Sequence, residues 1–203
     1  MPTVVLQMPA DADSRRFDAS RAHVLDAPER LVWLPPAEVV ANLLLEPTDV
    51  IADLGAGTGY FSLPMASETT HGKIYAVDSQ KEMLDLIEDK LSDQQASNVH
   101  LVHADAHKTG LADGSCSFVF MANVWHEFDD RTAVLHESLR ILTRPGRIAV
   151  LDWRPDVERE AGPPLDHRID YKAAMAELAA AGFQAIAHRN IGLYSWLVQG
   201  TVL

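Results

Sequence analysis

The sequence predicts an α/β fold in which a mostly parallel β-sheet is covered by helices on both faces. Over most of the 203 residues, short apolar runs typical of buried strands alternate with segments that carry apolar residues at helical spacing. A glycine-rich loop follows the first apolar run, and no helical segment separates the last two strand-like runs. Those last two runs can only pair as a hairpin, which places one antiparallel strand in the sheet.

The individual elements follow from the length and spacing of the apolar residues. The predicted strands cover residues 50–54, 73–77, 99–102, 117–121, 148–151, 183–188 and 193–202. The predicted helices cover residues 37–45, 60–68, 80–91, 131–142 and 170–181. Residues 190–192 are expected to turn between the last two strands, and the polar, proline-bearing residues 153–169 are expected to form a long loop.

Composition excludes several classes of protein. With 17 basic and 29 acidic residues the formal charge is −12, which disfavours a nucleic-acid partner. No apolar run is long enough to predict a membrane span. The N-terminus has no pattern of a secretory signal, and a single cysteine, Cys116, cannot form an intrachain disulfide. We therefore expect a cytoplasmic protein.

The loop after the first strand is the strongest candidate for a ligand site. Gly55, Gly57 and Gly59 allow a tight turn and a close approach of backbone N–H groups to a ligand. The alternative is a strand-to-helix turn without a ligand. A dinucleotide loop would need glycine where Tyr60 stands, and no phosphate-loop lysine follows. The loop thus fits neither a nicotinamide dinucleotide nor a nucleoside triphosphate.

Acidic residues follow the next two strands. In a parallel sheet the ligand lies beyond the carboxyl ends of the strands. Asp78 ends the second strand, where a carboxylate can accept hydrogen bonds from ribose hydroxyls, and Asp105 follows the third, where it can accept one from an adenine amine. The alternatives are a helix N-cap for Asp78, although Ser79 is better placed for that role, and a polar loop residue for Asp105.

Four segments together carry a resemblance to a known family. Residues 50–62 (VIADLGAGTGYFS), 76–78 (AVD), 104–106 (ADA) and 139–147 (LRILTRPGR) resemble motifs of class I S-adenosylmethionine-dependent methyltransferases. The most similar group contains the methyltransferases of ubiquinone and menaquinone biosynthesis. The resemblance implies a Rossmann-like sheet with strand order 3-2-1-4-5-7-6 and strand 7 antiparallel. Residues 36–203 would form this domain, and residues 1–35 an N-terminal arm with a short helix over the site.

The resemblance also assigns candidate residues to S-adenosylmethionine. The glycines would line its methionine part, Asp53 would support the loop, Asp78 would hold the ribose, and Asp105 with Ala106 would hold the adenine. Asn123 follows the fourth strand, where the methionine end is expected. The candidate cofactor-binding residues are Asp53, Gly55, Ala56, Gly57, Gly59, Asp78, Ser79, Asp105, Ala106 and Asn123.

The expected reaction is methyl transfer to a small-molecule acceptor. His126 is the candidate general base, because imidazole titrates near neutral pH, and the alternative is a structural histidine. Aromatic walls are expected from Trp33, Trp125, Phe128 and Trp153. No metal is expected, since Asp130 stands where a second zinc-binding histidine would follow His126.

Two rival functions and the assembly state stay open. The chain could instead be a catalytically silent module that binds S-adenosylmethionine and regulates a partner. A nicotinamide oxidoreductase is disfavoured by Tyr60. The sequence leaves the oligomeric state open, with a homodimer as one option.

Overall fold

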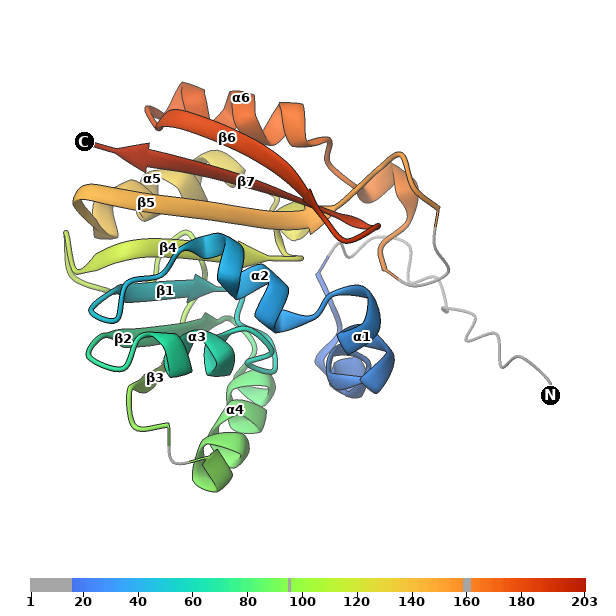
Figure 1. The fold of residues 1–203 in the computed structure, drawn as a ribbon, viewed down its shortest axis with the longest axis vertical. Coiled ribbons are helices and arrows are strands. Elements are labelled where there is room, and N and C mark those ends of the chain that lie inside the picture. Colours follow the sequence, from blue (N-terminus) through green and yellow to red (C-terminus); the bar gives the residue numbers. More distant parts are fainter. Residues whose placement is uncertain (1–15, 95, 159–161) are drawn as a thin grey trace.

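The molecule is built on one mixed β-sheet, shown in Figure 1. The computed structural model describes residues 16–94, 96–158 and 162–203. Its seven strands follow the order β3-β2-β1-β4-β5-β7-β6, as predicted. The first five strands in this order are parallel to one another, and β7 is antiparallel to both β5 and β6. The strands are β1 (Val50–Leu54), β2 (Lys73–Asp78), β3 (Val99–His103), β4 (Cys116–Ala122), β5 (Leu142–Trp153), β6 (Gln184–Ile191) and β7 (Ser195–Val202).

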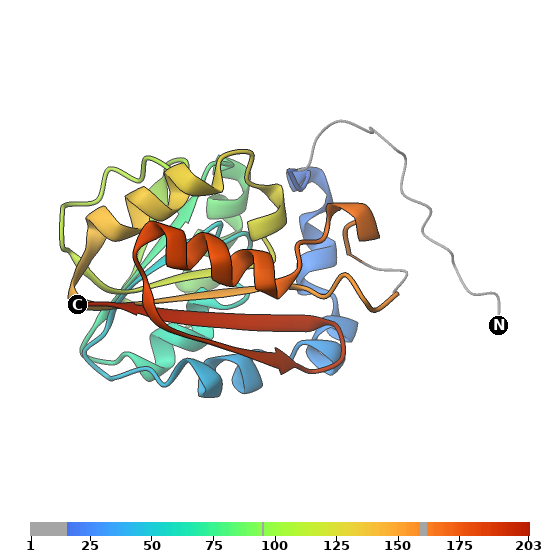
Figure 2. The same ribbon diagram turned by 90° about the horizontal axis from the view of Figure 1, so that it is seen from above.

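Helices cover both faces of this sheet. Apolar residues of α2, α3 and α4 form one core with the sheet, and those of α5 and α6 form a second core on the other face. Figure 2 shows α2 on one side of the sheet and α5 and α6 on the opposite side. The helices are α1 (Pro28–Trp33), α2 (Pro36–Leu43), α3 (Ser62–Glu68), α4 (Lys81–Gln94), α5 (Arg131–Ile141) and α6 (Tyr171–Ala181). Short 3-10 helices are η1 (Ala19–Asp26), η2 (Trp125–Glu127) and η3 (Leu165–His167).

Local sequence signals fix the ends of the helices. The carboxylates of Asp130 and Asp170 accept backbone N–H groups at the first turns of α5 and α6. Such caps satisfy amides that have no partner within the helix. Gly182 ends α6 with a φ of 106°, a left-handed conformation that glycine adopts without a steric penalty.

The register of the parallel strands brings their carboxyl ends to one edge of the sheet. Leu54 of β1 pairs with Val77 of β2, so Asp78 extends one residue beyond it. Beside β4, the Asn123 N–H donates to the carbonyl of Leu151 in β5 at 2.8 Å. Figure 1 shows α1 beyond these strand ends, so the N-terminal part of the described chain lies at the same edge.

Several boundaries differ from the sequence predictions, among them those of β5, the final hairpin and the N-terminal lead-in. Strand β5 extends over Leu142–Trp153 instead of residues 148–151, because Leu142 already pairs with Cys116 and β7 accompanies the strand to Trp153. The final hairpin turns at residues 192–194, because residues 190 and 191 still pair with β7. The predicted loose lead-in at residues 1–22 is a 3-10 helix from Ala19, and residues 1–15 lie outside the described chain. None of the helices in the described ranges has the length and hydrophobicity needed to cross a lipid bilayer.

The first testable prediction concerns the fit of Gly55 against the loop after β4. Gly55 has a φ of 75°, and a Cβ atom there would lie 2.7 Å from Cγ2 of Val124. We expect Gly55→Ala to lower the free energy of unfolding by roughly 2–4 kcal/mol, from the left-handed backbone and the overpacking together. Urea unfolding measures this loss.

Gly110 supplies the matched control. Its φ is 73°, but a Cβ atom there would meet nothing within 4 Å. Gly110→Ala should therefore show only the backbone cost of about 1–2 kcal/mol. Adding Val124→Ala to Gly55→Ala should remove most of the difference between the two glycine variants. Equal losses at Gly55 and Gly110 would contradict the close contact.

Candidate functional site

The glycine loop after β1 is tied to the end of β2 by backbone hydrogen bonds. The N–H groups of Gly55 and Ala56 both donate to the carbonyl of Val77, at 2.8 and 3.0 Å. The N–H of Gly57 donates to Oδ2 of Asp78 at 2.8 Å. Positive φ angles at all three loop glycines permit this tight path. The loop and Asp78 therefore form one connected unit.

Asp78 lies at the centre of this unit. Its side chain is buried, and Oδ1 accepts the Gln80 N–H at 2.9 Å while Oδ2 accepts that of Gly57. Burial raises the pKa of Asp78, and these two backbone donors oppose the rise. A carboxylate has about four acceptor positions, so capacity for further donors remains. The neighbouring Ser79 carbonyl contacts Nε2 of His103 at 3.1 Å.

Asp53 links the end of β1 to the start of α3, on either side of the glycine loop. It is fully buried near the end of β1, and Oγ of Ser62 donates to its Oδ2 at 2.5 Å. Burial raises the pKa of Asp53 to about 7, and the charge of Asp78 adds to the rise. At neutral pH this position therefore carries only part of a negative charge.

The remaining predicted residues are spread along the same edge. Gly59 is packed against α4, where a Cβ atom would lie 3.1 Å from Ile87. Asp105 is exposed two residues beyond β3, and Ala106 packs at the margin of the core beneath α5 and α6. Asn123 adopts a φ of 56° after β4, and its Oδ1 is buried. That oxygen accepts no hydrogen bond from any described residue.

His126 and Glu127 lie in η2, directly after β4. His126 is only 5% exposed, and its Nδ1 lies 2.8 Å from Oδ1 of Asp152 at the end of β5. Glu127 is also largely buried, and Oε1 lies 3.9 Å from Nε2 of His126. Burial raises the pKa of Glu127 to about 7, and the negative charges of Asp152 and Asp78 contribute to the rise.

An N-terminal strap, residues 16–26, lies across these strand ends. The Phe17 N–H donates to Oε2 of Glu127 at 3.0 Å, and its carbonyl accepts Nε2 of Gln80 at 2.9 Å. The Ala19 N–H donates back to Oε1 of Gln80 at 3.2 Å. Arg16 lies 3.5 Å from Asp105, the other end of the row of predicted residues. The strap therefore contacts the ends of β2 and β4 and the segment after β3.

The far end of the strap is anchored beside the glycine loop. Asp26 accepts Oγ1 of Thr58 at 2.9 Å and pairs with Lys90 at 2.7 Å. Arg30 is buried and stacks on the ring of Tyr60 at 4.0 Å, and burial lowers its pKa to about 10. The strap is thus held by side-chain contacts at both of its ends.

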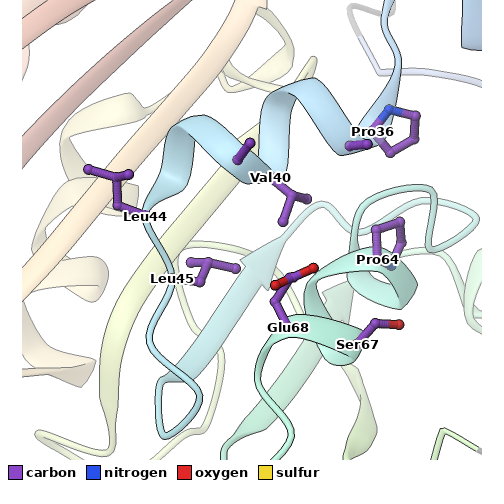
Figure 3. Close-up of a pocket in the computed structure, with 9 residues that line it drawn as sticks. Pro36, Val40, Leu44, Leu45, Pro64, Ser67 and Glu68 are labelled. Carbon is purple, nitrogen blue, oxygen red and sulfur yellow. The ribbon is translucent and has the colours of Figure 1, made fainter.

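A groove lies between α2 and α3, as Figure 3 shows. Its volume is about 600 Å³. Its lining is mainly apolar with Glu68 and Ser67 at one side, and it contains none of the predicted site residues. The residues that line it are Pro36, Ala37, Val40, Ala41, Leu44, Leu45, Pro64, Ser67 and Glu68.

Sequence reasoning misplaced two aromatic residues and missed two polar ones. Trp125 and Trp153, both expected in a pocket wall, are buried, and Trp125 belongs to the core beneath α5 and α6. Asp152 was missed, although it is an acid at a strand end like Asp53 and Asp78. Gln80 was also missed, although its side chain hydrogen-bonds to the strap. Its partners are backbone atoms 61 and 63 residues away, which no local sequence pattern indicates.

The geometry can now be compared with known proteins. A family model described as a methyltransferase domain matches residues 52–150. A demethylmenaquinone methyltransferase of Thermotoga maritima is 32% identical over 117 residues, which are 57% of this chain and 49% of that protein. One of Deinococcus radiodurans is 26% identical over 152 residues, which are 75% of this chain and 60% of that protein. The chain thus matches about half to three fifths of the length of these relatives.

Solved structures of methyltransferases resemble this chain over a larger share of its length. A SAM-dependent methyltransferase from Aquifex aeolicus has a TM-score of 0.87 and 27% identity, covering 93% of this chain and 100% of that one. A putative type 11 methyltransferase from Sulfolobus solfataricus has a TM-score of 0.62 and 28% identity, covering 74% and 82%. The chain thus has the fold of these S-adenosylmethionine-dependent methyltransferases and resembles a methyltransferase domain in sequence over residues 52–150.

Proposed function

We propose that this chain binds S-adenosylmethionine at the carboxyl edge of its sheet and transfers the methyl group to a small-molecule acceptor. The observation that carries the proposal is the unit formed by the glycine loop and Asp78, where Gly57 N–H meets the carboxylate at 2.8 Å. In this fold a ligand lies beyond the carboxyl ends of the strands, and this unit stands there.

The charges of the site fit the cofactor. Burial raises the pKa of Asp53, Asp78 and Glu127, so the ionised form of these carboxyl groups is disfavoured unless a cation lies nearby. S-adenosylmethionine carries a sulfonium and an ammonium group, and a cation nearby stabilises such carboxylates. The buried, unbonded Oδ1 of Asn123 offers an acceptor to the ammonium group.

Each candidate residue then has a proposed role. Asp78 and Ser79 hold the ribose, Asp105 and Ala106 hold the adenine, and Asn123 holds the methionine end. The loop residues Gly55, Ala56, Gly57 and Gly59 leave room for the methionine part. Asp53 fixes the loop through Ser62.

When bound, S-adenosylmethionine supplies an electrophilic methyl carbon. The chain's own contribution is to position the acceptor and to exclude water, which the strap is placed to do. Two features support a small acceptor. The formal charge of −12 disfavours polyanions. Both relatives are named demethylmenaquinone methyltransferases, and a quinone-type acceptor is neither a nucleic acid nor a protein.

The proposed ribose contact predicts a specific loss of affinity. In Asp78→Asn, one of the N–H groups of Gly57 and Gln80 would face an amide donor, and the negative charge is lost. We expect the affinity for S-adenosylhomocysteine to fall by roughly 1.5–3 kcal/mol, measured by calorimetry. Asp113→Asn, on an exposed carboxylate paired with Arg140, is the control and should bind normally. Unchanged affinity in Asp78→Asn contradicts the assignment.

Radiolabelled methyl transfer tests the acceptor class. We expect label from S-adenosylmethionine to reach one or more members of a panel of phenols, naphthols, quinols and amines. Bulk tRNA and DNA should stay unlabelled, because the acidic surface repels them. Efficient labelling of nucleic acid with none of the small molecules would overturn the proposal. Tight binding of the cofactor with no transfer to any acceptor would instead favour the silent regulatory module.

A further inference from the structure

The end of β5 places a fully buried carboxylate against an imidazole of η2. Both oxygens of Asp152 lie within hydrogen-bond distance of Nδ1 of His126, at 2.8 and 3.0 Å. The same carboxylate accepts the backbone N–H of His126 at 2.8 Å and that of Trp153 at 2.7 Å. Since Asp152 is 0% exposed, these contacts hold both the ring and its backbone in one position.

This contact decides which ring nitrogen holds the proton. An ionised carboxylate can only accept hydrogen bonds, so Nδ1 of His126 must be the donor. The neutral imidazole then has its lone pair on Nε2. Nε2 makes no hydrogen bond with the described residues, and Oε1 of Glu127 lies 3.9 Å from it. The lone pair is thus left available.

The side chain next to Nε2 is Glu127, which connects the ring to the strap. Glu127 accepts the Phe17 N–H of the strap through Oε2. Asp78 also contributes to the electrostatic environment of Glu127. His126 is 5% exposed, so little of its side chain is accessible to bulk water.

We propose that His126 and Asp152 form a catalytic dyad, in which Asp152 is a positioning residue and Nε2 of His126 removes a proton from the acceptor. This inference rests on the proposed methyl transfer and narrows its acceptor. The nucleophilic atom of the acceptor must carry a removable proton. The substrate class is therefore a hydroxyl compound, a thiol or an acidic carbon, as in a phenol or a quinol.

The step balances in atoms and charge. Nε2 takes the proton from the nucleophilic atom of the acceptor, and the electron pair of that bond stays on the acceptor. That pair forms the new bond to the methyl carbon, while the bond from methyl to sulfur breaks and its electron pair stays on sulfur. The proton remains on His126, stabilised by Asp152, until it passes to water. The methylated acceptor and S-adenosylhomocysteine leave.

Several charged groups face the ring and set the pH at which it acts. Burial alone lowers the pKa of His126, but the carboxylates of Asp152 and Glu127 more than offset this, and Arg168 opposes them. The pKa of His126 is therefore raised above its ordinary value. A protonated imidazole cannot accept a proton, so the transfer rate should rise with pH through this raised pKa and then level off.

Two near-isosteric variants test the dyad. His126→Asn keeps an N–H donor toward Asp152 but has no atom at Nε2. Asp152→Asn presents an amide donor to Nδ1 and should shift the ring proton to Nε2. With 1-naphthol or another acceptor that the native chain methylates, both variants should lose about 100-fold or more in kcat/KM. Both should also lose the rise of the rate with pH, while affinity for S-adenosylhomocysteine stays within about threefold.

A readout independent of turnover tests the positioning role. In the native protein without ligand, at a pH where the ring is neutral, ¹⁵N NMR of the imidazole should show His126 protonated at Nδ1. In Asp152→Asn it should show the proton on Nε2. His136→Asn, on an exposed histidine of α5, is the matched control and should leave rate and pH profile unchanged.

The outcomes separate this inference from the methyl transfer itself. If the native protein does not bind S-adenosylhomocysteine, the proposed function is refuted. The NMR result would still report on the dyad. Native protonation at Nε2, or a native rate and pH profile in His126→Asn, would overturn the dyad. Transfer only to acceptors that lack a removable proton, such as thioanisole or N,N-dimethylaniline, would overturn the substrate class.

Discussion

Negative charge buried at the carboxyl edge of the sheet is the constraint on which the rest of the site depends. Asp53 and Glu127 both have a pKa raised to about 7, and that of Asp78 is also raised. Burial is the largest cause at each position, because it removes the water that would stabilise the charged form. Each group therefore binds a proton more readily in the folded chain than in the unfolded one.

This constraint has a definite sign for stability. A carboxyl group with a raised pKa favours the folded state below the folded pKa, where it is protonated. For Asp53 and Glu127 that contribution is lost as the pH rises from the ordinary range of carboxyl groups to about 7. Near neutral pH the site without ligand thus holds charge at a cost in stability, and a cationic ligand relieves it. The same carboxyl groups therefore lower the stability of the free protein and would favour the binding of a cation.

The strap and the dyad both depend on this edge. Phe17 covers Glu127 through a backbone hydrogen bond, and this cover is part of why the carboxylate is buried. Asp152 orients His126 from the end of the neighbouring strand, so the ring is fixed before any acceptor arrives. One end of the sheet therefore combines an imidazole held by a carboxylate, the glycine loop and the strap. That arrangement suits a reaction in which positioning supplies most of the rate.

Much of this could be predicted from the sequence, and the exceptions have physical reasons. Strands, helices and the glycine loop were predictable because their signals are local: periodicity, caps and glycines at positive φ. The full length of β5 was not, because its start is fixed by the pairing of Leu142 with Cys116 of β4 and its end by pairing with β7.

Contacts between distant residues explain the other differences. Phe17 and Glu127 are 110 residues apart, and no pattern within either segment indicates their hydrogen bond. A tryptophan is equally at home in a hydrophobic core and in a pocket wall, so the sequence alone could not place Trp125. Its packing in the folded chain puts it in the core. Asp152 was predictable in principle, since the rule that drew attention to Asp53 and Asp78 applies equally to the end of β5.

Proton release on binding tests whether the carboxyl groups at this edge receive a cation from the ligand. Calorimetry at pH 7 in buffers of different ionisation enthalpy gives the number of protons exchanged when the native chain binds S-adenosylmethionine. Because a cation lowers the pKa of nearby carboxyl groups, we predict net proton release. Release should be smaller with S-adenosylhomocysteine, which lacks the sulfonium charge. No release, or proton uptake, with S-adenosylmethionine would contradict the account.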